Sequence, residues 1–166
     1  MPLTRRTFLR TGLAGGALLA CAGWLNAAGP RALKPDERDM LAAIAGVLLA
    51  GALPPSGAAR RQAIARTVDG IATAVAGLSV ATQKEVGELF GLLVLAPARH
   101  LLAGVAAPWR EAAPGEIADF LESWRTSRVG LLQSGYLALH DLTFGAWYAR
   151  PESWAAIGYP GPPEVF

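Results

Sequence analysis

Few residues in this chain have side chains and spacings that could carry out chemistry. His140 and Asp141 could form an acid–base pair, but adjacent residues on a helix point about 100° apart and no nucleophile accompanies them. His100 follows Arg99 and has no second ligand at helical spacing. Cys21 is the single cysteine, so it cannot form an internal disulfide. These residues predict neither a catalytic site nor a metal site.

The sequence also lacks the motifs that hold cofactors. It contains no Gly-rich dinucleotide or phosphate loop, no nucleophile elbow and no Cys/His spacing for zinc or haem. Fifteen Lys and Arg face thirteen Asp and Glu, and three of the arginines lie in the first ten residues. The rest of the chain then has a net charge of about −1, with no basic face for a run of phosphates. We therefore expect no cofactor in this chain, no independent enzymatic activity and no nucleic acid as a partner.

The amino-terminal residues have the pattern of an export signal. Arg5 and Arg6 precede Phe8, Leu9 and an apolar run over residues 13–22, an order typical of twin-arginine signals. That run is too short to cross a bilayer, which takes roughly 20 apolar residues in a helix. We interpret the first 28 residues as a signal peptide for the twin-arginine translocase, which carries folded cargo. The expected location is the periplasm.

The processing of this signal has two alternatives. Small-residue cleavage sites occur at residues 20–22 and at residues 26–28, and either would make an ordinary signal peptide. Residues 18–21 form an imperfect lipobox, in which Leu19 is the atypical position. Lipidation of Cys21 would tether the mature chain to a membrane, whereas ordinary cleavage would discard this thiol. Cleavage is favoured, and lipidation stays open.

Apolar periodicity predicts helices in the central part of the chain. The expected segments are residues 35–50, 58–76, a third that begins after Ser79 and that Pro97 kinks or ends, and a longest one over 113–148. No segment shows the sustained alternation of a strand. The sequence therefore predicts an all-α domain of about four helices within residues 29–149.

The longest predicted helix carries one basic side chain on its apolar side. Arg128 falls at helical spacing between Trp124 and Leu131, so its guanidinium is expected either to be buried with a partner or to contact another protein. Gly130 and Gly135 mark the points at which this helix could break in two.

Residues 150–166 are rich in proline and glycine and are predicted to be extended. Trp154 and Tyr159 are candidate anchors for a partner protein, since both residue types are enriched at binding hot spots. The prolines beside Tyr159, which are Pro160 and Pro162, would limit the entropy lost on binding. Tyr148 is a further candidate, although it is expected to pack mainly within the domain. The alternative is that the anchors fold back on their own helices.

Two segments near the carboxyl terminus carry a resemblance to a known family. These are Phe-Gly-Ala-Trp-Tyr-Ala-Arg-Pro at residues 144–151 and the segment that runs from Trp154 to a Gly-Tyr-Pro-Gly-Pro ending at residues 158–162. Together with the leader they resemble the small subunit of membrane-bound flavin-dependent dehydrogenases, the gluconate 2-dehydrogenase subunit 3-like family. Only the carboxy-terminal quarter matches specifically.

The resemblance implies a non-catalytic gamma subunit that binds, stabilises and co-exports a large dehydrogenase subunit of the glucose-methanol-choline type. FAD would be bound by that partner, and a cytochrome c subunit would take the electrons at the cytoplasmic membrane. The competing hypothesis is a free-standing periplasmic or lipid-tethered helical module that binds a small apolar ligand. An uncovered hydrophobic face would favour the subunit, and a closed apolar pocket would favour the module.

Overall fold

The structure is a computed structural model that describes residues 31–154 and 157–161. Within these residues the chain forms six α-helices, one 3-10 helix and no strands, so the predicted all-α class is confirmed. The elements are α2 (Pro35–Leu48), α3 (Gly57–Ala76), α4 (Val80–Val94), α5 (Ala96–Ala103), α6 (Pro114–Arg125), α7 (Gly130–Tyr148) and η1 (Pro151–Ser153). The candidate residues Arg5, Arg6, Phe8, Leu9, Cys21 and Pro162 lie outside the described residues.

Local capping signals start the helices where the sequence predicts them. Pro35 opens α2, and the carboxylate of Glu37 accepts a hydrogen bond from the backbone N–H of Lys34 at 3.0 Å. Ser79 precedes α4, and its hydroxyl accepts from the backbone N–H of Thr82 at 3.2 Å. Each contact satisfies an amide that the first helical turn leaves without a partner.

The helix predicted over residues 113–148 is broken in two, the alternative that its two glycines left open. The chain forms α6 and α7 instead, with a turn over residues 126–129 between them. Leu131 was expected on the buried face, but 80% of it is exposed. Gly130 is the first residue of α7, so one of the two predicted break points is where the second helix starts. The turn lets α7 fold back against α6.

The other predicted break point, Gly135, lies inside α7 and serves packing. A Cβ atom at Gly135 would lie 2.6 Å from Cζ3 of Trp124, so only glycine leaves room for the indole ring. The indole Nε1 of Trp124 also donates to the carbonyl oxygen of Leu102 at 2.9 Å. Trp124 thereby connects α6 to both α5 and α7.

Pro97 lies in the first turn of a separate short helix, α5, so the prediction that the preceding helix kinks or ends here is confirmed. Proline is tolerated in a first helical turn, where its missing N–H has no partner in any case. Within the described residues no single helix is long and apolar enough to cross a membrane. The α4–α5 pair meets that criterion only when taken together, and the two helices are bent by 91°.

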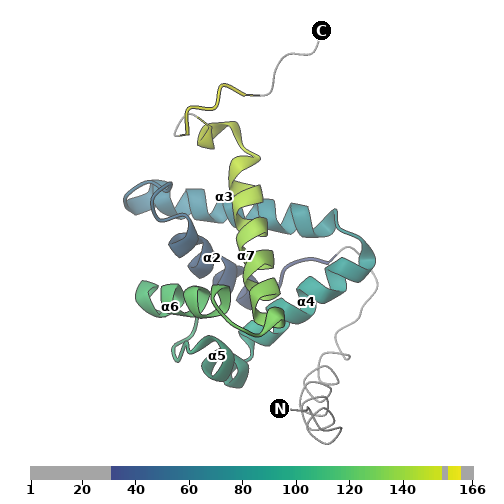
Figure 1. Ribbon diagram of the computed structural model, residues 1–166. Coiled ribbons are helices and arrows are strands. Elements are labelled where there is room, and N and C mark those ends of the chain that lie inside the picture. Colours follow the sequence, from purple (N-terminus) through teal and green to yellow (C-terminus); the bar gives the residue numbers. More distant parts are fainter. Residues whose placement is uncertain (1–30, 155–156, 162–166) are drawn as a thin grey trace, which may run out of the picture. The chain divides into compact units, whose positions relative to one another are not determined.

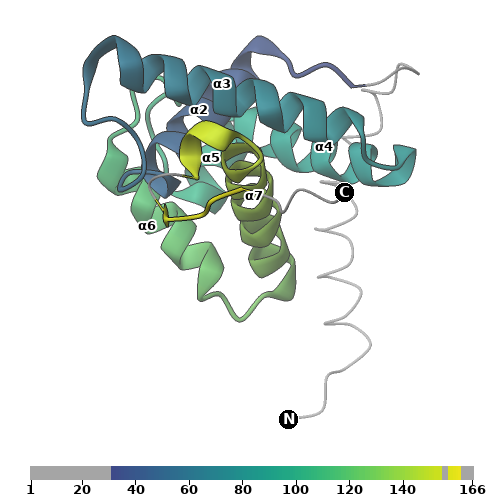
Figure 2. The same cartoon turned by 90° about the horizontal axis from the view of Figure 1, so that it is seen from above.

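The main hydrophobic core takes buried side chains from all six α-helices. Figure 1 shows α2 between α3 and α6, and Figures 1 and 2 show α7 lying across α3, where the two helices are in contact. A Cβ atom at Gly70 of α3 would lie 3.0 Å from that of Ala146 of α7, so the glycine permits this close crossing. A smaller cluster surrounds Trp147 at the end of α2.

The first described residue is held against two helices. The guanidinium of Arg31 makes a salt bridge to Glu37 of α2, whose side chain is only 1% exposed. The backbone N–H of Arg31 donates to Oε1 of Gln83 in α4 at 3.3 Å. A Cβ atom at Gly87 would lie 2.6 Å from the same guanidinium, so glycine makes room for it. We call Arg31, Glu37, Gln83 and Gly87 the amino-terminal clasp.

Candidate functional site

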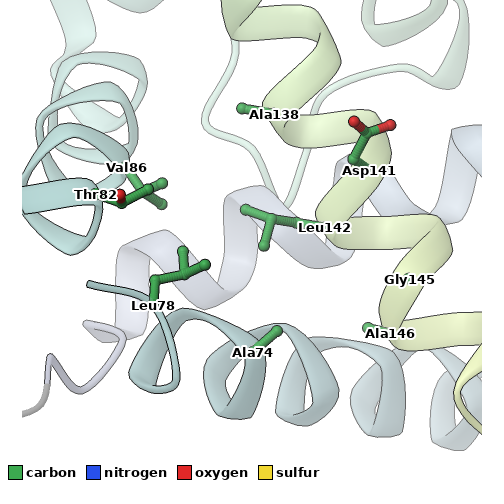
Figure 3. Close-up of a pocket in the computed structure, with 9 residues that line it drawn as sticks. All are labelled: Ala74, Leu78, Thr82, Val86, Ala138, Asp141, Leu142, Gly145 and Ala146. Carbon is green, nitrogen blue, oxygen red and sulfur yellow. The ribbon is translucent and has the colours of Figure 1, made fainter.

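An apolar groove lies between α3, α4 and α7, and Figure 3 shows the side chains around it. Its volume is about 290 Å³, and it is open to solvent rather than enclosed. Only two of its lining residues, Thr82 and Asp141, have polar side chains. The lining residues are Ala74, Leu78, Thr82, Val86, Ala138, Asp141, Leu142, Gly145 and Ala146. The groove is not predictable from the sequence, because its walls come from three separate helices.

The connection between α3 and α4 shapes one side of the groove. The side-chain amide of Gln83 donates to the carbonyl oxygens of Ala76 and Leu78, at 3.2 and 2.9 Å. These bonds occupy carbonyls at the carboxyl end of α3 and hold the start of α4 beside it. Figure 3 shows the side chains of Leu78, from the α3–α4 connection, and of Leu142, from α7, extending into the groove. The groove is thus bounded by elements that hydrogen bonds and packing keep in place.

A row of four rings follows a different flank of α7. Tyr136, His140, Phe144 and Tyr148 are spaced four residues apart and all are partly exposed. Their ring centroids are separated by 5.7, 4.4 and 6.0 Å along the row. Side chains at this spacing share one face of a helix, so the row is continuous over about three turns. Because of this, α7 presents apolar groups to solvent on two flanks.

The structure joins His140 and Asp141 by one hydrogen bond. Nδ1 of His140 lies 2.9 Å from Oδ1 of Asp141, and 75% of the Asp141 side chain is exposed. His100 is exposed on α5. In the described part of the chain, no group of three or more His, Cys, Asp or Glu side chains could hold a metal ion.

Arg128 was predicted to lie on a helix face, and the structure corrects this placement. The residue is exposed in the turn between α6 and α7, so its guanidinium is not buried. No salt bridge joins it to another described residue. In the last turn of α6, the guanidinium of Arg125 instead pairs with Glu122 at 2.7 Å, and its hydrogen bonds lower the pKa of Glu122. Arg128 therefore remains available for an acidic group on another protein.

The prediction of an extended tail is wrong for the residues that follow α7, because Pro151–Ser153 form a 3-10 helix. The guanidinium of Arg150 lies 4.9 Å from the ring centroid of Trp147 and donates to Oγ1 of Thr67 at 3.2 Å. A cation over an indole face and a bond to a buried hydroxyl both attach this segment to the domain. The start of the tail therefore belongs to the folded body.

Trp154 contacts its own chain. Its Nε1 donates to the carbonyl oxygen of Tyr148 at 2.8 Å, and its ring meets that of Tyr159 edge-on at a centroid distance of 5.3 Å. Of the two alternatives for Trp154, the structure has the one in which it folds back. Tyr159 remains 44% exposed and Pro160 is exposed beside it, so these two residues remain candidates for contact with a partner.

We expect Trp154→Ala to lower the free energy of unfolding by about 1–2 kcal/mol. It removes a partly buried ring and one hydrogen bond, each of which contributes on the order of 1 kcal/mol. Thermal unfolding of the full chain would measure this loss. Trp154→Phe is the control, because it keeps a ring against Tyr159 and removes only the indole donor. An unchanged melting temperature for Trp154→Ala would contradict the assignment of Trp154 to the folded body.

Comparison of the chain with protein-family models, with curated proteins and with solved structures finds no match.

Proposed function

We propose that this chain is a non-catalytic small subunit that binds, stabilises and co-exports a flavin-dependent dehydrogenase of the glucose-methanol-choline type. In this proposal the twin-arginine signal of the small subunit carries both chains to the periplasm. The partner binds FAD and the substrate, and a cytochrome c subunit accepts the electrons. The complex is associated with the cytoplasmic membrane.

The observation that supports this proposal is the open apolar groove between α3, α4 and α7. The groove is small, so it supports the proposal as one apolar part of a wider contact surface rather than as a large exposed patch. The partly exposed ring row on a different flank of α7 provides a second surface for contact. A larger partner subunit could bury both surfaces in its interface with this chain.

The groove gives less support to the competing hypothesis of a module for a small apolar ligand. Ligand pockets usually have volumes of roughly 300–1,000 Å³ and enclose most of the ligand surface. This groove, at about 290 Å³, is at the lower end and is open. A protein segment that lies along the groove would bury more of it than a small molecule would.

We predict that the full chain, tagged after Phe166 and expressed in its native host, co-purifies with a flavoprotein in a fixed ratio. Flavin absorbance and mass spectrometry of the periplasmic and membrane fractions would identify it. Replacing both Arg5 and Arg6 with lysine should lower the periplasmic amount of both proteins by at least about tenfold, because the signal of one chain serves two.

The matched control is Arg61→Lys, which changes an exposed arginine of α3 outside the signal. It should leave the location of both chains unchanged. A colourless chain that purifies alone would contradict the proposed function. A flavoprotein that reaches the periplasm in equal amount without the arginine pair would contradict co-export.

A further inference from the structure

The groove contains a glycine that the packing of this chain does not explain. A Cβ atom at Gly145 would meet no heavy atom within 4 Å, apart from its own helix and neighbours, whereas Cβ atoms at Gly70 and Gly135 would press on Ala146 and Trp124. Glycine within a helix loses more conformational entropy on folding than alanine does. An alanine at position 145 would therefore fit the isolated domain better.

Glycine at this point leaves backbone accessible to another molecule. Ala74, Ala138 and Ala146 line the groove beside Gly145, and none of their side chains extends beyond Cβ. Two helices approach most closely where small residues meet, because the distance between helix axes depends on the side chains at the contact. The larger side chains of Leu78, Val86 and Leu142 also line the groove, and Figure 3 shows Leu78 and Leu142 extending into it, where they can pack against aliphatic side chains of an incoming helix. This arrangement suits a helix whose backbone lies close over Gly145.

The groove also has a charge preference. Asp141 is its one ionisable lining residue, and most of this side chain is exposed. Nδ1 of His140 is hydrogen-bonded to Oδ1, which leaves Oδ2 for another donor. A Lys or Arg on the incoming helix can lay its methylene groups on the apolar wall and place its charge at this carboxylate. An acidic residue at the same position would be repelled.

We propose that the groove is the docking site for a helix of the partner subunit that presents an aliphatic stripe flanked by a Lys or Arg. The basic side chain pairs with Asp141, and the helix backbone approaches Gly145. This inference rests on the proposed function and specifies which surface of the small subunit is used and what chemistry it recognises.

Gly145→Leu tests the docking site, because a Cβ atom at this position meets no heavy atom within 4 Å and the added side chain takes up space in the groove. The full-length variant is titrated with the flavoprotein that co-purifies with the native chain. We expect binding to weaken by at least about tenfold, while the melting temperature of the variant alone stays level or rises by about 2–4 °C. Gly130→Ala is the matched control, since a Cβ atom there also meets open space but lies at the other end of α7. It should leave binding unchanged.

Asp141→Lys tests the charge preference. We expect a slower association rate and a reversed dependence on salt, with Asp141→Asn intermediate. A photo-crosslinking residue at position Thr82 should capture a partner peptide that contains a Lys or Arg next to aliphatic residues. Capture of an acidic peptide, or of a second copy of this chain, would overturn the proposal.

Different results would contradict the docking site and the accessory function. If the flavoprotein binds Gly145→Leu as tightly as the native chain, the groove is not the docking site, but the accessory function stands. If no flavoprotein co-purifies with the native chain, the proposed function itself fails, and the groove has no partner helix to receive.

Discussion

Trp124→Ala is expected to lower the free energy of unfolding by about 3–5 kcal/mol, the usual cost of deleting a buried aromatic ring. The ring is 2% exposed and meets Phe120 edge-on at a centroid distance of 4.8 Å. Its Nε1 donates to the carbonyl oxygen of Leu102. The substitution removes the side chain that joins α6 to α5 and α7, so the loss should approach the upper part of the range. Denaturant titration of the full chain would measure it.

A double substitution separates this contact from a general loss of core volume. Gly135→Ala alone should cost about 1–3 kcal/mol, because its Cβ would lie 2.6 Å from Cζ3 of Trp124. In the Trp124→Ala background the same change should cost almost nothing, since the ring is gone. Equal costs in the two backgrounds would show that Gly135 is not required by Trp124.

Much of the fold is predictable from the sequence because local signals act within a few residues. Pro35, Ser79 and Pro114 each begin a helix at the expected place, and the carboxylate of Glu116 caps the backbone N–H of Ala113 at 3.1 Å. The apolar stripes of α2, α3 and α4 supply buried residues of the main core, as their periodicity predicts. These features depend on residue order alone.

The errors occur where contacts between distant residues decide the structure. Helical spacing continues from Trp124 to Leu131, so the sequence predicts one helix, but the turn at residues 126–129 lets α7 pack on α6. Glu122 supports this turn, because its carbonyl oxygen accepts from both the N–H and the hydroxyl of Thr126. A threonine hydroxyl bonded to the carbonyl four residues earlier weakly disfavours continuation of the helix, so Thr126 is only a weak sequence signal for this turn.

The candidate site was less predictable than the fold. The sequence analysis selected aromatic tail residues by their type, and it could not show that Trp154 folds against Tyr148. It also could not find the groove, because Leu78, Val86 and Gly145 are brought together only by the crossing of three helices. The one local signal was Gly145 within a predicted helix. Whether such a glycine serves internal packing or leaves an open surface depends on whether a Cβ atom there would meet another residue, and this requires the structure.

The amino-terminal clasp gives the second large prediction. Arg31→Ala should lower the free energy of unfolding by about 3 kcal/mol, the lower end of the cost of breaking a buried pair, because the Arg31 side chain is 19% exposed. The cost arises at Glu37, whose buried carboxylate would keep, among the described residues, one hydrogen-bond donor, the backbone N–H of Lys34. Thermal and denaturant unfolding of the full chain would measure the loss.

Glu37→Gln decides whether charge is the cause. The amide oxygen of glutamine can still accept from Lys34, but it carries no buried charge that needs a guanidinium. In this background Arg31→Ala should therefore cost less than about 1 kcal/mol, since little is left uncompensated. If the two costs are equal, the Arg31 side chain stabilises the domain by packing against Gly87 rather than by neutralising Glu37, since the bond to Gln83 comes from the backbone N–H and is kept in the variant. Because the twin-arginine pathway carries folded cargo, the proposed function further requires that Arg31→Ala lower the exported amount in proportion to its loss of stability.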